Sequence, residues 1–235
     1  MSGAVKNLDT ACLRLATYNI HQWVGGDGRA DIGRVLSVIR SLDADLIALQ
    51  ELLLPWEGFT QEDLARETCM EVIPGRTLYR GDAEYGNAVL TRLPVRSTCS
   101  LELTVPPFEP RGALCVSLLA GDVPVKVVAT HLGMRQRERL RQMEALMPEL
   151  ETPEQVVVML GDINEWVPRS PVLGRLRAAF GPQPAPRTFP SRLPLLALDR
   201  ILARPPAFDR FPCAVRTGRA RAASDHLPLE ASLRV

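Results

Sequence analysis

The stretch LRLATYNIH, residues 13–21, indicates the type of fold to which the chain belongs. Its first part is short and apolar, as in a buried β-strand, and it ends in two polar residues, Asn19 and His21. The next apolar run, residues 46–50, is followed in the same way by Glu51. The chain therefore begins with strands that carry polar side chains at their ends.

Similar runs continue along the chain. Many of them are rich in β-branched residues or bounded by Gly, Pro and Asp, and they predict eight strands. These strands are residues 13–20, 46–50, 88–91, 113–120, 125–130, 156–160, 195–202 and 227–235. Apolar residues spaced by three and four predict helices between some of the strands. The helices are residues 31–41, 61–69, 135–150 and 171–180.

The order of these elements favours a mixed α/β domain with sheet inside and helices outside. Residues 88–130 hold consecutive strands without room for helices, so antiparallel pairing is expected there. The proline-rich residues 181–194 predict a long surface loop. The length of 235 residues suits a single domain over 1–235, with residues 1–12 as an N-terminal tail.

Composition excludes several classes of protein. Hydrophobic residues make up 46% and charged residues 23%, which is typical of globular domains, and no apolar run is long enough to span a bilayer. The net charge of +1 argues against holding long nucleic acids by bulk electrostatics, although a local basic patch stays open. Five scattered cysteines without a C-x-x-C pair, and no secretory signal, favour a cytoplasmic protein. We expect a monomer.

Polar residues recur where six predicted strands begin or end. One carboxylate after a strand is usually a turn or cap residue, but all three histidines of the chain lie at such boundaries beside other candidates. If the sheet edges align, these groups converge on one mouth. The set is Asn19, His21, Glu51, His131, Asp162, Asn164, Asp199, Asp225 and His226.

The residue types in this set favour metal-assisted hydrolysis. Glu51 and Asp225, supported by Asn19, offer the hard oxygen ligands that suit Mg²⁺ or Mn²⁺ better than zinc. An acid beside a histidine suits an activated water as nucleophile. A serine triad is disfavoured, because Ser224, Asp225 and His226 are contiguous and adjacent strand residues point to opposite faces.

Eight motifs in order resemble the endonuclease/exonuclease/phosphatase superfamily, the group of deoxyribonuclease I-like enzymes, and its short bacterial members in particular. They are TYNIH (17–21), ALQE (48–51), YGNAVLTRLP (85–94), PRGAL (110–114), ATHLG (129–133), LGDIN (160–164), LDRI (198–201) and SDHLPL (224–229). The resemblance implies a four-layer α/β/β/α sandwich of two mixed β-sheets with helices on the outer faces.

It also implies roles for the polar residues. Glu51 resembles the principal ligand of a divalent metal, Mg²⁺ or Mn²⁺, with Asn19 and Asp225 beside it; Asn19 serves either as a ligand or as a brace for Glu51. Asp162 resembles the residue that orients or deprotonates the attacking water, and Asn164 the residue that holds a phosphate oxygen.

The two remaining histidines have corresponding positions in the family. His226 resembles the histidine that contacts the scissile phosphate, with Asp199 as its carboxylate partner. His131 resembles a second histidine, which acts as a general acid or a phosphate donor. Substrate-binding positions are Asn87, Arg111 and His21.

Some residues near these positions have two interpretations. Trp23, Trp166 and Phe189 lie in predicted loops near the mouth, where packing is at least as plausible as substrate stacking. The arginines of the helix over 135–150 are expected to form a solvated face, with binding of a phosphate-rich partner as the alternative.

These features predict a metal-dependent phosphoesterase that hydrolyses a phosphodiester, with a small-molecule or lipid-linked substrate. The main alternative is a DNA or RNA endonuclease with the same catalytic groups, and the shortness of the chain disfavours it. A noncatalytic binding module that retains the fold is the third interpretation. The intact set of Glu51, Asp162, Asp199 and His226 argues against it.

Overall fold

The computed structural model describes residues 12–153 and 156–235. Apart from Cys12, which opens the first strand, the predicted N-terminal tail lies outside these residues. The strands are β1 (Cys12–Asn19), β2 (Leu46–Leu54), β3 (Glu71–Arg80), β4 (Ala83–Thr91), β5 (Val95–Glu102), β6 (Gly112–Ala120), β7 (Val123–His131), β8 (Val156–Asp162), β9 (Asp199–Arg204), β10 (Phe208–Ala214) and β11 (Leu229–Arg234). The helices are α1 (Ile32–Leu42), α2 (Gln61–Thr68), α3 (Gln136–Leu150), α4 (Pro171–Phe180) and α5 (Gly218–Ala223), with a short 3₁₀ turn at His21–Trp23.

The strands form two mixed sheets. One has six strands in the order β10-β11-β1-β2-β4-β3, and the other has five in the order β5-β6-β7-β8-β9. Each sheet contains one parallel pair, β1 with β2 and β7 with β8, and the remaining pairs are antiparallel. A helix links the strands of each parallel pair, α1 in the first and α3 in the second, as parallel connections require.

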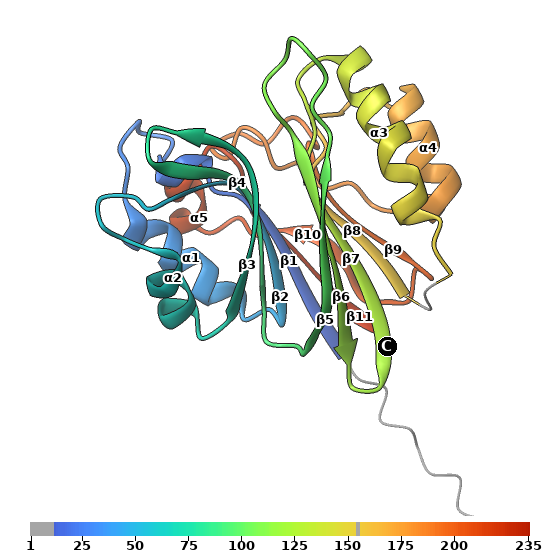
Figure 1. Cartoon of the computed structure of the whole chain (residues 1–235), viewed down its shortest axis with the longest axis horizontal. Helices are drawn as coiled ribbons and strands as arrows, with labels where there is room; N and C mark the ends of the chain where they lie inside the picture. Colours follow the sequence, from blue (N-terminus) through green and yellow to red (C-terminus); the bar gives the residue numbers. More distant parts are fainter. Residues whose placement is uncertain (1–11, 154–155) are drawn as a thin grey trace, which may run out of the picture.

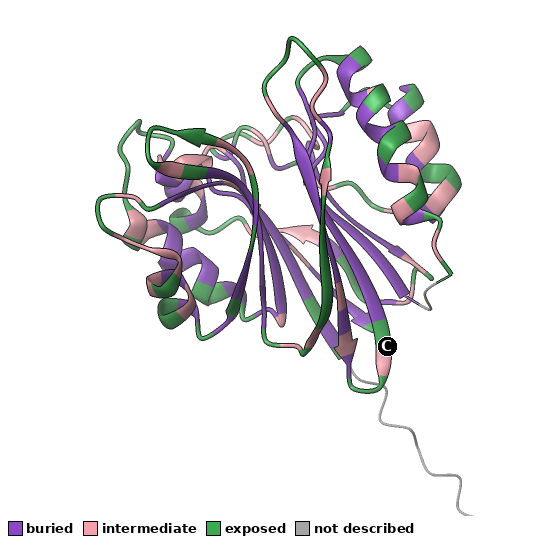
Figure 2. Ribbon diagram, in the orientation of Figure 1, coloured by how far each residue is buried: buried purple, intermediate pink, exposed green. Residues whose placement is uncertain are grey.

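The two sheets pack face to face, and helices cover both outer faces (Figure 1). Apolar residues of the facing sheet surfaces form the central cluster. A second cluster lies between the six-stranded sheet and α1, α2 and α5, and a third lies between the five-stranded sheet and α3 and α4. Figure 2 shows the central strands buried, whereas the edge strand β5 and the outer sides of the helices carry exposed residues. The four-layer α/β/β/α sandwich expected from the sequence is therefore confirmed.

Three strands and one helix were missed by the sequence prediction. β3, β5 and β10 lie at the edges of the sheets, and none contains a long apolar run. Helix α5 has only six residues. Antiparallel pairing was right for β5, β6 and β7, whereas β4 belongs to the other sheet.

Several predicted boundaries were wrong. The strands expected over 46–50 and 88–91 are longer, because β2 runs to Leu54 and β4 begins at Ala83. The strand expected over residues 195–202 begins at Asp199, because the proline-rich loop extends to Leu198. The strand expected over 227–235 begins at Leu229. Residues 181–194 form the predicted loop, apart from an isolated bridge between Phe189 and Leu196.

The register of the five-stranded sheet aligns three polar residues in one row. His131 on β7 pairs with Asp162 on β8, and Asp162 pairs with Asp199 on β9. Because side chains alternate along a strand, Asp162 continues the row of Val158 and Leu160, which face the other sheet. The site residues thus extend the central core to the end of the sandwich where β1, β2, β7 and β8 end.

Gly161 permits the close approach of β7 and β8 next to Asp162. Its φ is +140°, and a Cβ placed there would lie 1.9 Å from the carbonyl oxygen of Thr130. A larger residue would therefore push the two strands apart.

None of the helices within residues 12–153 and 156–235 is long and apolar enough to cross a membrane.

Candidate active site

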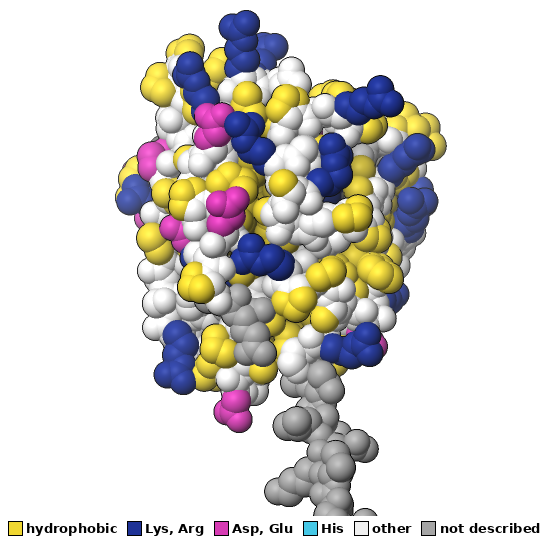
Figure 3. Space-filling view, turned by 90° about the vertical axis from the view of Figure 1, so that its right-hand side faces the viewer, with side chains coloured by type: hydrophobic (Ala, Val, Ile, Leu, Met, Phe, Trp, Pro, Cys, Tyr) yellow, Lys and Arg dark blue, Asp and Glu magenta, His cyan; other side chains and the backbone are white. Residues whose placement is uncertain are grey.

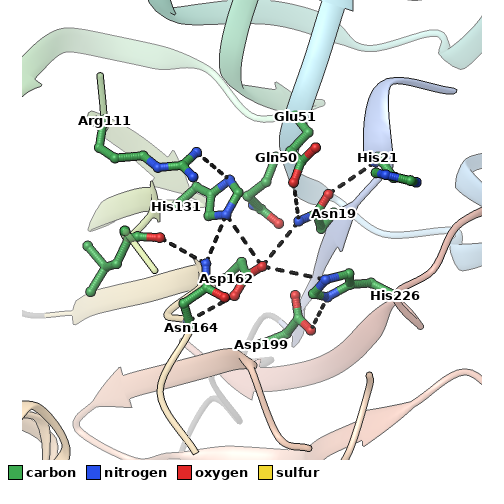
Figure 4. Close-up of polar contacts among 12 residues, drawn as sticks. Asn19, His21, Gln50, Glu51, Arg111, His131, Asp162, Asn164, Asp199 and His226 are labelled. Carbon is green, nitrogen blue, oxygen red and sulfur yellow. Dashed lines mark hydrogen bonds and ion pairs between the residues drawn. The ribbon is translucent and has the colours of Figure 1, made fainter. Parts of the chain in front are cut away.

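Asn19 at the end of β1 connects the two sheets within the site (Figure 4). Its Nδ2 donates to Glu51 Oε1 and to Asp162 Oδ2, both at 3.1 Å. Its Oδ1 accepts the backbone N–H of His21 at 3.1 Å. Asn19 is 1% exposed, so these contacts take place out of bulk water. In this conformation Asn19 braces Glu51 through its amide nitrogen.

Glu51 lies at an irregularity of β2. The register with β4 shifts between Leu49 and Leu52, and Glu51 has a φ of +56°. Such strained conformations cluster at functional sites, where the surrounding structure holds them in place. The second carboxylate oxygen of Glu51, Oε2, accepts a hydrogen bond from Gln22 Nε2 at 3.3 Å. Within the described part of the chain, no Lys, Arg or His pairs with the half-buried Glu51 carboxylate, which is therefore free to hold a cation.

Gln22 is a site residue that the sequence interpretation missed. It lies in the turn His21–Trp23, where all three residues have positive φ. The neighbouring NIH motif was the only signal that pointed to this turn.

Asp162 is the centre of the cluster. Its Oδ1 accepts the backbone N–H of Asn164 at 2.9 Å, and its Oδ2 lies 3.5 Å from His131 Nε2 and 3.7 Å from His226 Nε2. Asn164 has a φ of +52°, and its Nδ2 lies 3.1 Å from His131 Nε2 and donates to the carbonyl oxygen of Leu132 at 2.9 Å. A single buried carboxylate therefore contacts two imidazoles and the amide of Asn19.

His226 is held by Asp199. The distance from His226 Nδ1 to Asp199 Oδ2 is 2.9 Å, and the hydroxyl of Thr188 donates to the same oxygen. Burial alone would lower the pKa of His226, but the charges of Asp199 and Asp162 outweigh it and raise the pKa to about 10. His226 is therefore an imidazolium at neutral pH.

The neighbours of this pair come from the proline-rich loop. The ring of Phe189 lies 4.9 Å from the ring of His226, which makes Phe189 a packing partner of the imidazole. Thr188 was missed by the sequence interpretation, because no local pattern in this loop marks it.

His131, unlike His226, is neutral at pH 7. Burial lowers its pKa to about 3, and the nearby charge of Arg111 acts in the same direction. Arg111 Nη1 lies 3.3 Å from His131 Nδ1. The site thus holds one neutral and one charged histidine on either side of Asp162, with the buried Arg111 as a second cation.

His21 and Asp225 lie close to each other beside Asn19. His21 Nδ1 is 3.1 Å from the carbonyl oxygen of Val24 and 3.7 Å from Asp225 Oδ1. The hydroxyl of Ser224 donates to the carbonyl oxygen of Asn19 at 2.8 Å, which places the SDH motif beside β1. Ser224 forms no relay with His226, as the sequence predicted.

Asn87 occupies a different place from the other predicted residues. Its amide donates to the carbonyl oxygen of Gly112 at 2.9 Å and so links β4 to β6 across the two sheets. Among the contacts of the described residues, none joins Asn87 to the cluster around Asp162.

The aromatic side chains named from the sequence have different positions. Trp23 is fully buried, and its Nε1 donates to the carbonyl oxygen of Leu53 at 2.9 Å, so it is a core residue. Trp166 is 45% exposed on the loop that follows Asn164.

The expectation of a solvated arginine face on α3 was wrong for Arg139. Arg139 is 4% exposed, and its Nη2 pairs with the fully buried Glu165 at 3.1 Å. Its Nη1 donates to the carbonyl oxygens of Gly133 and Met134. This guanidinium therefore ties together the loops that follow β7 and β8.

Two sets of residues could hold a cation. The predicted set is Glu51 with Asn19 and Asp225. A second set is Asp162, Asp199 and His226, whose ligand atoms all lie within 4.8 Å of one another. Asp199 and His226 already use Oδ2 and Nδ1 on each other, whereas Glu51 contacts only neutral amides. The Glu51 carboxylate is therefore the more available ligand for a cation, and carboxylate oxygens suit Mg²⁺ or Mn²⁺.

The fold is an α/β/β/α sandwich with carboxylates, amides and imidazoles gathered near the ends of its two parallel strand pairs. The chain belongs to the Endonuclease/Exonuclease/phosphatase family, whose model matches residues 16–226. Members of this family are generally hydrolytic nucleases and phosphatases that act on phosphoesters or nucleic acids and typically use divalent metals.

Curated and solved proteins resemble the chain over nearly its whole length. The "Uncharacterized protein YbhP" of Escherichia coli K12 is 30% identical, and the match covers 94% of this chain and 95% of that protein. An endonuclease/exonuclease/phosphatase from Beutenbergia cavernae has a TM-score of 0.74 at 24% identity, covering 96% and 72% of the two chains. The human Nocturnin catalytic domain with a bound sulfate anion has a TM-score of 0.75 at 18% identity, covering 96% and 94%. The two structures support the fold alone.

Proposed function

We propose that this protein is a divalent-metal-dependent phosphoesterase that hydrolyses a phosphodiester, with a small-molecule or lipid-linked substrate and water as the nucleophile. The observation that carries the proposal is the position of Asp162. Its Oδ2 lies within 3.7 Å of a neutral and a charged imidazole and accepts the amide of Asn19, which also braces Glu51. A carboxylate in these surroundings can accept a proton from a water while cations next to it stabilise the phosphate.

Glu51 and Asp225 would hold Mg²⁺ or Mn²⁺ with the amide of Asn19 beside them. When bound, the metal supplies a positive charge that polarises the phosphoryl group and neutralises the negative charge that develops on it. The carboxylates fit this role, because carboxylate oxygens are ligands that these ions prefer, and Asn19 holds Glu51 in place through its amide nitrogen. The strained backbone of Glu51 and its purely neutral contacts support the assignment.

The remaining residues act on water and phosphate. Asp162 orients the attacking water and accepts its proton, and Asn164 donates from Nδ2 to a phosphate oxygen. The imidazolium of His226 stabilises charge on the scissile phosphate through Nε2. Asp199 fixes the orientation of the ring through Nδ1 and keeps it protonated.

His131 and Arg111 contribute on the other side of Asp162. Because the pKa of His131 is about 3, it is neutral at pH 7, which favours hydrogen bonding to phosphate over a general-acid role. Arg111 supplies the positive charge on this side. His21 lies beside Asp225 at the edge of the site, and Asn87 acts by holding the sheets together.

The decisive experiment compares hydrolysis of bis(p-nitrophenyl) phosphate and p-nitrophenyl phosphate with Mg²⁺, with Mn²⁺ and with EDTA. We expect metal-dependent cleavage of the diester, with Asp162→Asn lowering the rate by about 10²–10⁴. Asp209→Asn is the matched control, since it removes an exposed carboxylate on β10 at the opposite end of the sheet. The proposal would be contradicted if the folded protein cleaved neither ester at any metal concentration.

The nuclease alternative makes a separate prediction. On the face seen in Figure 3, basic side chains are spread among apolar and acidic ones, which gives no continuous track for a phosphate backbone there. Binding to single- or double-stranded oligonucleotides that falls steeply with salt would favour the nuclease. A metal-binding protein that cleaves no phosphoester would instead match the noncatalytic module.

A further inference from the structure

The carboxylate of Glu109 lies between two guanidinium groups at the mouth of the site. Its Oε1 is 3.1 Å from Arg111 Nη1, and its Oε2 is 3.2 Å from Arg80 Nη2. Glu109 belongs to the connection between β5 and β6 of one sheet, whereas Arg80 ends β3 of the other. The ion pair with Arg80 therefore joins the two sheets.

Both arginines are connected to the catalytic cluster. Arg111 Nη1, which pairs with Glu109, is also 3.3 Å from His131 Nδ1. Arg80 Nη1 donates to Gln22 Oε1 at 2.6 Å, and Gln22 donates to Glu51 at 3.3 Å. Glu109 is thus connected to His131 through Arg111. It is connected to Glu51 through Arg80 and Gln22.

The local structure holds Glu109 in this place. Prolines 106, 107 and 110 surround it and limit the conformations of the loop. The Arg80 guanidinium lies 4.3 Å from the centre of the Tyr85 ring, which restricts it as well. Glu109 itself is 40% exposed, so the carboxylate stays hydrated while it pairs with Arg111.

We propose that Glu109 determines the charge of the ligand that the site accepts, an inference that rests on the proposed phosphodiesterase function. Its carboxylate uses the Arg111 cation that a phosphate would otherwise use, and it repels each negative charge brought to the mouth. A diester carries one negative charge, whereas a monoester or inorganic phosphate carries nearly two above its second pKa of about 6. Glu109 therefore favours the diester substrate and disfavours phosphate monoesters and free phosphate.

The test begins with binding of inorganic phosphate, which needs no turnover. By calorimetry at pH 8 with saturating Mg²⁺ and again without it, Glu109→Gln should bind phosphate about three- to tenfold more tightly than the wild type. Arg80→Gln should bind it more weakly, because it removes one of the two cations that offset the Glu109 charge. Glu144→Gln, which removes an exposed carboxylate paired with Arg175 on the outer helices, should leave the affinity unchanged.

The second readout is the preference between the two nitrophenyl esters. The ratio of kcat/KM for the diester to that for the monoester should fall about three- to tenfold in Glu109→Gln and stay constant in Glu144→Gln. High salt should shrink the difference, because the groups are partly exposed. Glu109→Gln and Arg80→Gln should change phosphate affinity in opposite directions. Loss of folding would lower the affinity in both variants, so opposite changes indicate a charge effect.

Unchanged phosphate affinity and an unchanged ester ratio in a folded Glu109→Gln protein would overturn the inference. If the wild type cleaves neither ester while Glu109→Gln still binds phosphate more tightly, the role of Glu109 holds and the proposed function fails. If the diester is cleaved but Glu109→Gln leaves phosphate binding unchanged, the proposed function holds and the role of Glu109 fails.

Discussion

Asn19 Nδ2 and Asp162 Oδ2 lie 3.1 Å apart, although 143 positions separate the two residues in the chain. Asn19 ends β1 of one sheet and Asp162 ends β8 of the other, so this hydrogen bond joins the two sheets at the site. Ligands of α/β proteins bind beyond the carboxyl ends of parallel strands. Here two parallel pairs end on the same side of the sandwich, and polar residues at or near their ends meet.

We expect Glu51→Gln to lower the affinity for Mg²⁺ and Mn²⁺ by about tenfold or more, because it removes the charge of the principal carboxylate. Calorimetric titration of each metal into metal-free protein measures this directly. Glu71→Gln, an exposed acid at the start of β3, is the control. Equal metal affinity in the wild type and Glu51→Gln would indicate that the metal binds at Asp162, Asp199 and His226 instead.

Replacement of Asp199 by Asn should lower the pKa of His226 below its value of about 10, because the substitution removes the charge that keeps the imidazole protonated. NMR titration of the His226 ring measures the shift. Activity should then fall with rising pH at a lower pH than in the wild type. Thr188→Val removes only the hydroxyl contact to Asp199, so its effect should be smaller. A wild-type titration curve for His226 in Asp199→Asn would contradict the pairing.

His131 should make the protein sensitive to acid. Its folded-state pKa is about 3 and its unfolded value is about 6.5, so between these values only the unfolded state binds the extra proton. The stability that neutral His131 contributes is present above pH 6.5 and is lost as the pH falls towards 3. The loss approaches about 1.4 kcal/mol per pH unit.

Urea unfolding of the wild type and His131→Asn from pH 7 to pH 4 tests this expectation. The free energy of unfolding should decline less steeply in the variant, because the variant lacks the group that takes up the proton. Parallel curves for the two proteins would show that His131 does not cause the loss.

Gly161→Ala should destabilise the protein strongly, by about 2–4 kcal/mol, because the added Cβ would meet the carbonyl oxygen of Thr130. Gly174→Ala in α4 is the matched control, since a Cβ there meets nothing within 4 Å. In a helix that exchange should stabilise by up to about 1 kcal/mol. Thermal unfolding of both variants compares them, and similar melting temperatures would refute the steric argument.

Much of the site could be predicted because its residues lie next to strong local signals. Asn19, His131 and Asp162 each end a buried strand, and Glu51 follows the apolar run 46–50 within β2; such runs are recognisable from composition alone. The polar residue after the strand then marks the position where the chain leaves the sheet. The central strands of both sheets were found for the same reason.

The edge strands β3, β5 and β10 carried no such signal. β5 is exposed over most of its length, and β3 contains Pro74 and Gly75, which disfavour a strand in isolation. These segments are extended because an apolar neighbour offers them backbone hydrogen bonds, and this partnership is invisible along the sequence. The same holds for Arg139, whose charge predicts exposure until its buried partner Glu165 is known.

The sequence by itself determined the class of fold, the family and the residue types of the site, since these follow from local periodicity and from short motifs. Only the tertiary structure decided which groups touch and what charge they carry. His131 and His226 are alike in sequence, yet one is neutral and the other charged, because burial and the Arg111 charge lower the pKa of the first, whereas Asp199 and Asp162 raise the pKa of the second. Electrostatic interaction depends on distance in space, and folding alone sets that distance.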